Sequence, residues 1–295
     1  MSASRVLVTG AAGQLAGEVL KAFDGRIAAA FTRAALDIAD PLAVAAAVDA
    51  AAPDVIVNCA AFNDVDGAED RPMDALAVNA IGVRNLAVAA ERHGAVLVHY
   101  GTDFVFDGEA DEPYREETPP SPRSVYAMSK LLGEWFALEA PRSYALRVES
   151  LFGGDPSAYA RKGTLDKIVE GIVEGREVRV FTDRVVSPSH VGDIAAATRH
   201  LVETGAPYGL YHCVNDGVAT WYEVAQAAAD LLGVAPRLVA TTTDQVTLKA
   251  ARPRYCALSP AKLAAAGFPM PHWRAALARW IKERDATSPE NRQVS

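Results

Sequence analysis

Short apolar runs alternate with longer alanine-rich runs through the first half of this 295-residue chain. The apolar runs are β-branched and nearly continuous, as in strands covered on both faces. We expect strands at Arg5–Thr9, Ile27–Phe31, Val55–Asn58, Val96–Tyr100 and Tyr144–Val148. The alanine-rich runs have helical spacing and predict helices at Gln14–Phe23, Pro41–Ala51, Met73–Arg92 and Val125–Glu139. This alternation predicts the α/β class, with a doubly wound parallel sheet of the Rossmann type.

The pattern loosens after the breaker cluster Gly153-Gly154-Asp155-Pro156. We expect helices near Thr164–Glu174, Val191–Glu203 and Trp221–Leu232, and strands near Val178–Phe181 and Leu210–Val214. Residues 236–280 contain frequent prolines and predict short helices. We interpret this half as a smaller C-terminal α/β lobe.

Composition excludes several classes of function. The chain has 29 Lys and Arg against 37 Asp and Glu, a net charge of −8, which argues against a nucleic-acid partner. No apolar stretch is long enough for a signal peptide or a membrane span, so we expect a cytoplasmic protein without a membrane partner. The three cysteines form no C-x-x-C pair and the histidines show no ligand spacing, so we expect no metal.

The first predicted strand runs into a glycine loop, Thr9-Gly10-Ala11-Ala12-Gly13-Gln14-Leu15-Ala16-Gly17. Gly10 permits a tight turn, Gly13 allows a pyrophosphate to approach the backbone, and Ala16 lets the next helix pack closely on the sheet. The helix N-terminus then offers free N–H groups to phosphates. A loop of this kind after the first strand predicts a dinucleotide site.

The second predicted strand indicates which dinucleotide. It ends in Ala30-Phe31-Thr32-Arg33, without the carboxylate that binds the ribose hydroxyls of NAD. A guanidinium at Arg33 suits a 2′-phosphate, which favours NADP. Asp37 lies a few residues further on and can serve an adenosine, so NAD stays open.

A second motif, Tyr126-Ala127-Met128-Ser129-Lys130, places a phenol and an ammonium on one helix face. The ammonium favours the phenolate and lowers the pKa of the tyrosine, which can then exchange a proton with a carbonyl oxygen. Thr102 ends the fourth predicted strand, where ligands of parallel sheets bind, and can donate a hydrogen bond to the same carbonyl. Thr102, Tyr126 and Lys130 are therefore the candidate catalytic residues.

Two arginines near the C-terminus offer a different function. Arg252 and Arg254 have the forked guanidinium geometry that suits the diphosphate of a substrate. Surface charge on the smaller lobe is the alternative for both.

Together these motifs resemble the extended short-chain dehydrogenase/reductases, and within them the dTDP-4-dehydrorhamnose reductase family. The resemblance covers nearly the whole chain. Its motifs are Gly10–Gly17, Leu36–Asp40, Pro53–Ala61, Val65–Glu69, Val78-Asn79, Thr102–Gly108, Pro113-Tyr114, Val125–Lys130, Gly133-Glu134, Ser187-Pro188, Gly209–His212, Thr220–Tyr222 and Arg252-Pro253.

The resemblance implies a reductase of a nucleotide-activated 4-keto-6-deoxysugar that uses NAD(P)H. It implies a dinucleotide-binding domain at residues 1–152, to which 182–217 return, and a substrate lobe at 153–181 and 218–295. The residues implied to hold the cofactor are Gly10, Gly13, Gln14, Leu15, Arg33, Asp37, Ile38, Ala60, Ala61 and Asn79. Those expected on the substrate side are Asp103, Phe104, Ser150 and Arg252.

Departures from the family pattern gather on the substrate side. The family usually has Ser at Gly101, Tyr at Phe104, Gly at Ala127 and often Trp at Ser150, and Asn-Ser follows Arg-Pro where this chain has Arg254-Tyr255-Cys256. Lost hydroxyl and aromatic groups imply a remodelled pocket and an altered substrate.

Two alternatives remain. The first is a sugar-nucleotide epimerase or dehydratase, for which Glu149 is a candidate acid–base residue. The second is a non-catalytic regulatory subunit resembling that of methionine adenosyltransferase. The oligomeric state is also open, with a homodimer among the options.

Overall fold

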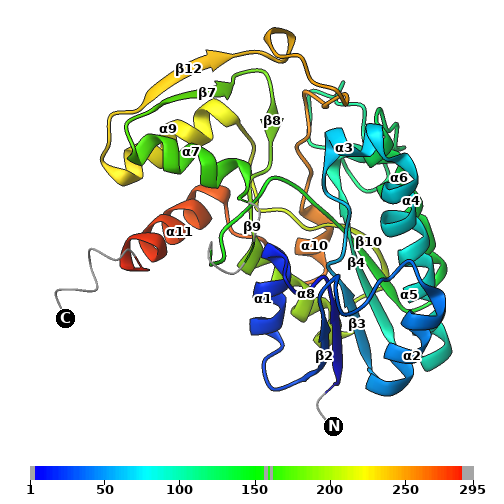
Figure 1. Cartoon of the computed structure of the whole chain (residues 1–295). Helices are drawn as coiled ribbons and strands as arrows, with labels where there is room; N and C mark the ends of the chain where they lie inside the picture. The colour runs from blue at the N-terminus through cyan, green and yellow to red at the C-terminus, as the bar shows by residue number, and fades with distance from the viewer. Residues whose placement is uncertain (1–3, 156–158, 160–161, 288–295) are drawn as a thin grey trace.

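The computed structural model describes residues 4–155, 159 and 162–287 (Figure 1). In this part of the chain the largest sheet has six strands in the order β10-β5-β4-β3-β1-β2, and every pairing in it is parallel. Its strands are β1 (Val6–Thr9), β2 (Ile27–Phe31), β3 (Val55–Asn58), β4 (Val96–Thr102), β5 (Ser143–Val148) and β10 (Gly209–His212). The order reverses direction at β1, which opens a ligand crevice at the carboxyl ends of β1 and β3.

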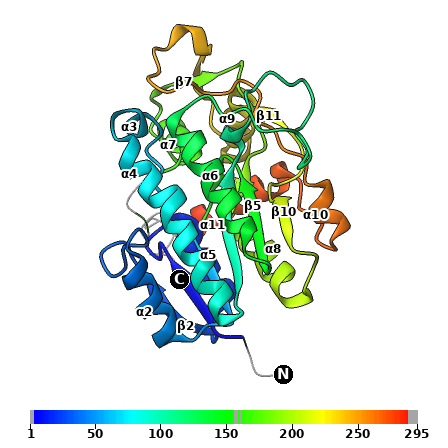
Figure 2. The same cartoon turned by 90° about the vertical axis from the view of Figure 1, so that its right-hand side faces the viewer.

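Helices cover both faces of this sheet, as expected. Helices α1 (Gln14–Ala22) and α8 (Val191–Thr204) lie on one face, and α2 (Pro41–Ala51), α5 (Gly82–His93) and α6 (Val125–Glu139) lie on the other (Figure 2). Alternate residues of β1 serve the two layers: Val6 and Val8 pack towards α1 and α8, and Leu7 packs towards α2 and α5.

Strand β2 differs from the expectation of two covered faces. Ala28 and Ala30 are exposed, because β2 is the edge strand next to β1. The alanine side chains expose little apolar surface on that face of β2, so the strand forms without helices packed over it.

The helix expected at Met73–Arg92 is instead a run of three pieces over Pro72–His93. A π-helical turn, η1 (Ala77–Ile81), separates α4 (Pro72–Leu76) from α5. This run is the one helix in the described part of the chain that is long and apolar enough to cross a membrane, and half of its most apolar window is buried inside the protein. Its buried apolar side chains, such as Val83 and Leu86, belong to the core, while Met73 and Val88 are exposed.

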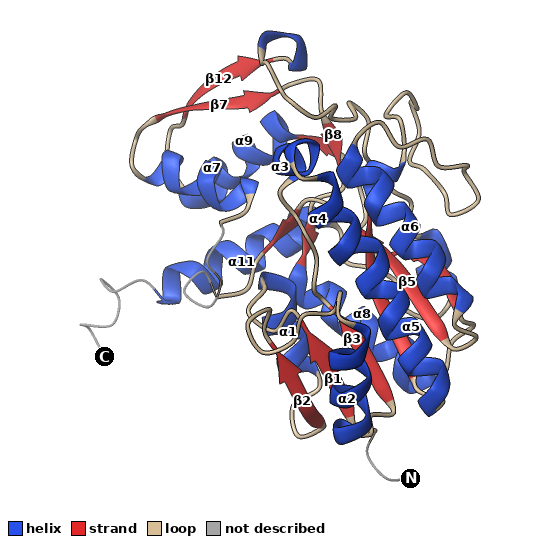
Figure 3. Cartoon of the chain, turned by 45° about the vertical axis from the view of Figure 1, so that its right-hand side comes forward, coloured by secondary structure: helices blue, strands red, loops and turns tan. Residues whose placement is uncertain are grey.

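A second core lies beyond the carboxyl ends of the main sheet (Figure 3). Its helices are α7 (Thr164–Val173), α9 (Trp221–Leu232) and α11 (Trp273–Thr287). Strand β12 (Arg237–Thr241) pairs in parallel with β7 (Glu177–Phe181) over α7 and α9 (Figure 1). Strand β12 was not predicted, because the prolines of residues 236–280 indicated only short helices.

Shorter elements connect the two cores. They are α3 (Val65–Asp70), η2 (Asp103–Val105), β6 (Leu151–Phe152), β8 (Val185–Val186), β9 (Ser189–His190), β11 (Ala219–Thr220), η3 (Thr243–Gln245) and α10 (Ala261–Ala265). Leu263 and Met270 pack into the same core as α1 and α8, although both lie in the segment expected to form the substrate lobe. The domain boundaries therefore stay a prediction.

Candidate active site

Two adjoining cavities open at the carboxyl ends of the central strands. The larger has a volume of about 510 Å³ and is lined by the ends of β3, β4 and β5, the start of α1 and one face of α6. The smaller, of about 240 Å³, lies beside the ends of β1 and β2. Both share Ala12, Gly13 and Cys59–Ala61, so the cavities form one elongated site.

The glycine loop has the geometry of a phosphate-binding turn. Gly10 has φ of +67°, and a Cβ at this position would lie 2.5 Å from the backbone nitrogen of Ala60. The N–H of Gly13 donates to the carbonyl of Gly10 over 2.9 Å, which closes the turn. No side chain caps α1, whose N-cap residue is Gly13, so its first N–H groups face the cavity without a side-chain acceptor. These features fit the pyrophosphate of a dinucleotide.

Nearly all of the residues expected to hold the cofactor line these cavities. Gly10, Arg33, Asp37 and Ile38 line the smaller one, Gln14 and Leu15 line the larger one, and Gly13, Ala60 and Ala61 line both. Gln14 also donates from Nε2 to the carbonyl of Gly153 over 2.9 Å, which ties α1 to the loop after β6.

Asn79 lies behind the cavity wall and lines neither cavity. Its side chain accepts a hydrogen bond from the N–H of Phe62 and donates to the carbonyl of Phe62 and to Oγ of Ser129. The π-helical turn directs this amide into the protein. Asn79 thus supports the wall formed by Ala60–Phe62 and the helix that carries Tyr126.

Thr102, Tyr126 and Lys130 all line the larger cavity. Ser124 caps α6 by accepting a hydrogen bond from the N–H of Ala127 over 3.2 Å, which sets the start of the helix. Tyr126 and Lys130 then follow one turn apart on the face that meets β4. The ring of Phe104 meets that of Tyr126 edge-on, with centroids 5.8 Å apart.

Lys130 is buried, with 3% of its surface exposed, and Nζ donates to the carbonyl of Tyr100 over 2.6 Å. Burial lowers the pKa of Lys130 to about 8, while the nearby carboxylate of Glu134 raises it. The lysine therefore enters the site as a poorly solvated cation that can switch to the neutral form near pH 8.

The substrate-side residues divide into two groups. Asp103, Phe104 and Ser150 line the larger cavity, and Ser150 has φ of +46°, a strained conformation for a residue with a Cβ. Arg252 lines neither cavity: both terminal nitrogens of its guanidinium donate to Asp66 over 2.8 Å.

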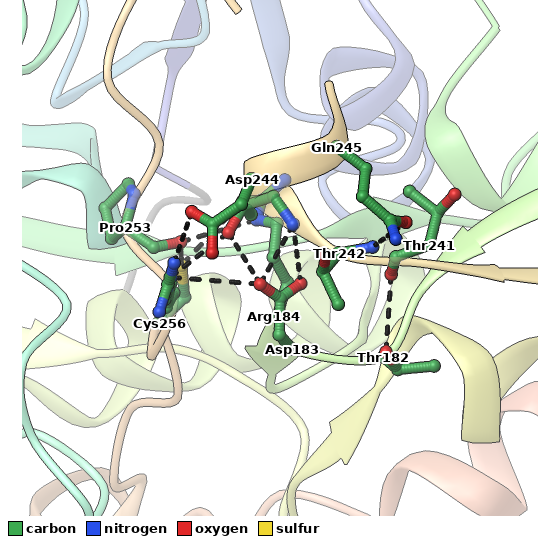
Figure 4. Close-up of polar contacts among 11 residues, drawn as sticks. Thr182, Asp183, Arg184, Thr241, Thr242, Asp244, Gln245, Pro253 and Cys256 are labelled. Carbon is green, nitrogen blue, oxygen red and sulfur yellow. Dashed lines mark hydrogen bonds and ion pairs between the residues drawn. The ribbon is translucent and has the colours of Figure 1, made fainter. Parts of the chain in front are cut away.

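Arg254 also lies outside both cavity walls. Its guanidinium donates to Asp244 and lies 3.8 Å from Asp183. Figure 4 shows these two acids beside each other. Both arginines are thus engaged by acidic partners in this structure.

Several lining residues escaped the sequence analysis. Asn63, Lys162 and Trp221 all contribute to the larger cavity. Trp221 also belongs to the second core. No local motif marks Lys162, which follows the breaker cluster by a few residues and forms an ion pair with Glu170.

Residues 4–286 match the sequence profile of the RmlD substrate binding domain. A dTDP-4-dehydrorhamnose reductase from Streptomyces griseus is 41% identical over 284 residues, which cover 92% of this chain and 91% of that protein. A dTDP-4-keto-6-deoxy-D-glucose reductase from Streptomyces niveus is 36% identical over 93% of this chain and 96% of that protein.

A solved structure adds a bound cofactor to the comparison. The dTDP-4-dehydrorhamnose reductase of Bacillus anthracis in complex with NADP superposes with a TM-score of 0.89 at 32% identity. The match covers 95% of this chain and 99% of that one.

Proposed function

Because this chain belongs to the RmlD substrate binding domain family and is an NAD(P)-dependent reductase of dTDP-4-keto-6-deoxysugars, we propose that Thr102, Tyr126 and Lys130 are its catalytic residues. The comparisons confirm the family and the fold class that the sequence analysis expected. The site residues and the mechanism are our proposal.

We propose that the elongated site binds NADP, the cofactor in the structure of the Bacillus anthracis relative, with the adenosine end in the smaller cavity. Arg33 and Asp37 border that cavity, where a guanidinium suits a 2′-phosphate. The turn at Gly10–Gly13 and the uncapped start of α1 suit the pyrophosphate. The bound nicotinamide supplies the hydride for the keto carbon.

Residues that line the larger cavity supply the proton that the keto oxygen takes up. Tyr126 donates its phenolic proton to the keto oxygen as that oxygen becomes an alkoxide. The positive charge of Lys130 stabilises the phenolate that remains. The hydroxyl of Thr102 donates a second hydrogen bond to the developing oxyanion.

The single observation that carries this mechanism is the convergence of Thr102, Tyr126 and Lys130 on the cavity that the glycine loop also lines. Asp103, Phe104 and Ser150 stand on the same walls, and we propose that they contact the sugar. We also propose that Arg252 contacts the substrate, which requires the substrate to displace the ion pair between Arg252 and Asp66. The absence of a metal, a cytoplasmic location and a homodimer remain expectations from the sequence.

The test is oxidation of NADPH, followed by its absorbance, with dTDP-4-dehydrorhamnose and with dTDP-4-keto-6-deoxy-D-glucose as separate substrates. NADH runs in parallel. Saturable oxidation with one of the two sugars identifies the substrate. An epimerase, a dehydratase or a regulatory subunit would bind the dinucleotide without consuming it, and that result would contradict the proposal.

A further inference from the structure

A buried ion pair joins α6 to the central sheet. Glu134 lies on α6, one turn after Lys130, and accepts hydrogen bonds from Nε and Nη2 of Arg147 on β5, both over 2.7 Å. Only 2% of each side chain is exposed. Arg147 is the partner of Gly101 where β5 pairs with β4, so the ion pair lies beside the end of β4.

Arg147 is held from two further sides. Its Nη1 donates to Nε2 of His212 over 3.3 Å, and Nδ1 of His212 in turn donates to the carbonyl of Tyr114 over 3.0 Å. Its guanidinium carbon lies 4.9 Å from the centroid of the Phe106 ring. A buried ion pair contributes little net stability, because the cost of desolvation offsets the attraction. We therefore looked for its effect on neighbouring groups.

The ion pair packs directly against the backbone of β4. A Cβ at Gly101 would lie 3.2 Å from Oε2 of Glu134 and 3.1 Å from Cγ of Arg147, so the glycine leaves the space that the pair occupies. The preceding residue, Tyr100, provides the carbonyl to which Lys130 donates. The ammonium and the ion pair are thus anchored at neighbouring residues of one strand.

Glu134 brings a negative charge to the ammonium of Lys130. Among the described residues, the ammonium also has the thiol of Cys59, the imidazole of His99 and the phenol of Tyr126 as titratable neighbours. Burial raises the pKa of Cys59 and lowers the pKa of His99, so both groups are neutral at pH 7. The carboxylate of Glu134 opposes the effect of burial on Lys130 and raises its pKa.

We propose that Glu134, held in place by Arg147, is a positioning residue that keeps Lys130 cationic beside Tyr126 and so sets the upper limit of the pH range of the reductase. This inference rests on the proposed role of Lys130. Glu134 lines neither cavity, so its effect on the reaction passes through the lysine. The carboxylate exchanges no proton and stays ionised throughout turnover.

The decisive variant replaces both charges, Glu134→Leu together with Arg147→Met, because apolar residues of similar volume can replace a buried ion pair without loss of stability. Without the carboxylate, the pKa of Lys130 should fall by about one unit from about 8. The charged fraction of Lys130 at pH 8 then falls from about one half to about one tenth. We expect kcat at pH 8 to fall about fivefold and KM for the sugar to change by less than about twofold.

Two further variants separate charge from packing. Glu134→Asp keeps the negative charge and should keep the inflection of kcat near pH 8, even where it lowers stability. Glu134→Gln removes the charge, keeps the shape and should move the inflection as the double variant does. Glu139→Gln, at an exposed position on the same helix, is the matched control and should leave the pH profile unchanged.

A second readout needs no substrate. NMR of the intact protein, labelled with carbon-13 at the Cε atoms of lysine, follows the titration of Lys130, whose signal is identified by its loss in Lys130→Met. The midpoint should lie at about pH 8 in the wild type and about one unit lower in the double variant.

Equal midpoints in the wild type and the double variant would overturn the proposal, as would a midpoint that moves as far in Glu134→Asp as in Glu134→Gln. If the wild type reduces no keto-sugar, the proposed function fails instead, and the NMR titration still decides whether Glu134 sets the charge of Lys130.

Discussion

Nζ of Lys130 donates a 2.6 Å hydrogen bond to the backbone carbonyl of Tyr100, so the helix that carries the candidate catalytic tyrosine is bonded to the strand that carries Thr102. The contact is buried and holds the ammonium at one place in the wall of the larger cavity. It also gives the lysine a structural role beside its electrostatic one, and the two roles can be separated by pH.

The charge of Lys130 predicts that the reaction slows at alkaline pH. Burial lowers the pKa of Lys130 to about 8, so the cation is present below this pH and is lost above it. We expect kcat to fall as pH rises through about 8. Lys130→Met should be slow at every pH and should lack this inflection, whereas Lys21→Met, on the surface of α1, should retain it. An inflection near pH 8 that persists in Lys130→Met would assign it to another group.

Tyr126 is expected to be the proton donor. Tyr126→Phe keeps the ring that packs edge-on against Phe104 but removes the hydroxyl. Turnover should fall by about a hundredfold or more, the usual contribution of general acid catalysis, with NADPH affinity unchanged. Tyr222→Phe, on α9 and outside both cavity walls, serves as the control. Turnover within tenfold of wild type would show that another group supplies the proton.

Arg33 is expected to set the preference for NADPH. It is exposed at the rim of the smaller cavity, where its guanidinium can meet a 2′-phosphate. Arg33→Ala should raise KM for NADPH by roughly tenfold, the scale of one lost charge-assisted hydrogen bond, and leave KM for NADH nearly constant. Arg84→Ala removes an exposed charge on α5 and is the control. Equal changes for both cofactors would place the 2′-phosphate elsewhere.

Much of the fold follows from local sequence signals. Three helices have the predicted bounds, Pro41–Ala51, Val125–Glu139 and Trp221–Leu232, and each begins after a side chain that caps it: Asp40, Ser124 or Thr220. The strands Ile27–Phe31 and Val55–Asn58 also match, because continuous apolar runs between turn residues leave few other structures.

The features that the sequence did not predict depend on contacts between residues far apart in the chain. Strand β12 is a strand because it pairs with β7, about 60 residues earlier in the chain, and nothing within Arg237–Thr241 identifies that partner. Arg252 suited a diphosphate by its chemistry, but the fold brings Asp66 within 2.8 Å of it. Neither pairing leaves a local pattern that periodicity or spacing detects.

The π-helical turn is a third example, and it yields a prediction about stability. Gly133 of α6 lies against this turn, and a Cβ at its position would lie 1.9 Å from the carbonyl oxygen of Asn79. Backbone cannot yield that far without moving the Asn79 side chain from Phe62 and Ser129. Gly133→Ala should therefore lower the free energy of unfolding by roughly 3 kcal/mol, at the upper end for an overpacked core.

Gly17→Ala is the matched control, because it is also a helical glycine but has no atom within 4 Å of the added Cβ. It should raise the free energy of unfolding by about 0.5–1 kcal/mol, since alanine favours the helix. Urea denaturation of both variants measures the difference. Equal stabilities would mean that α6 can move away from η1. The contact between Asn79 and α6, which carries Tyr126, would then not explain how the wall of the larger cavity keeps its shape.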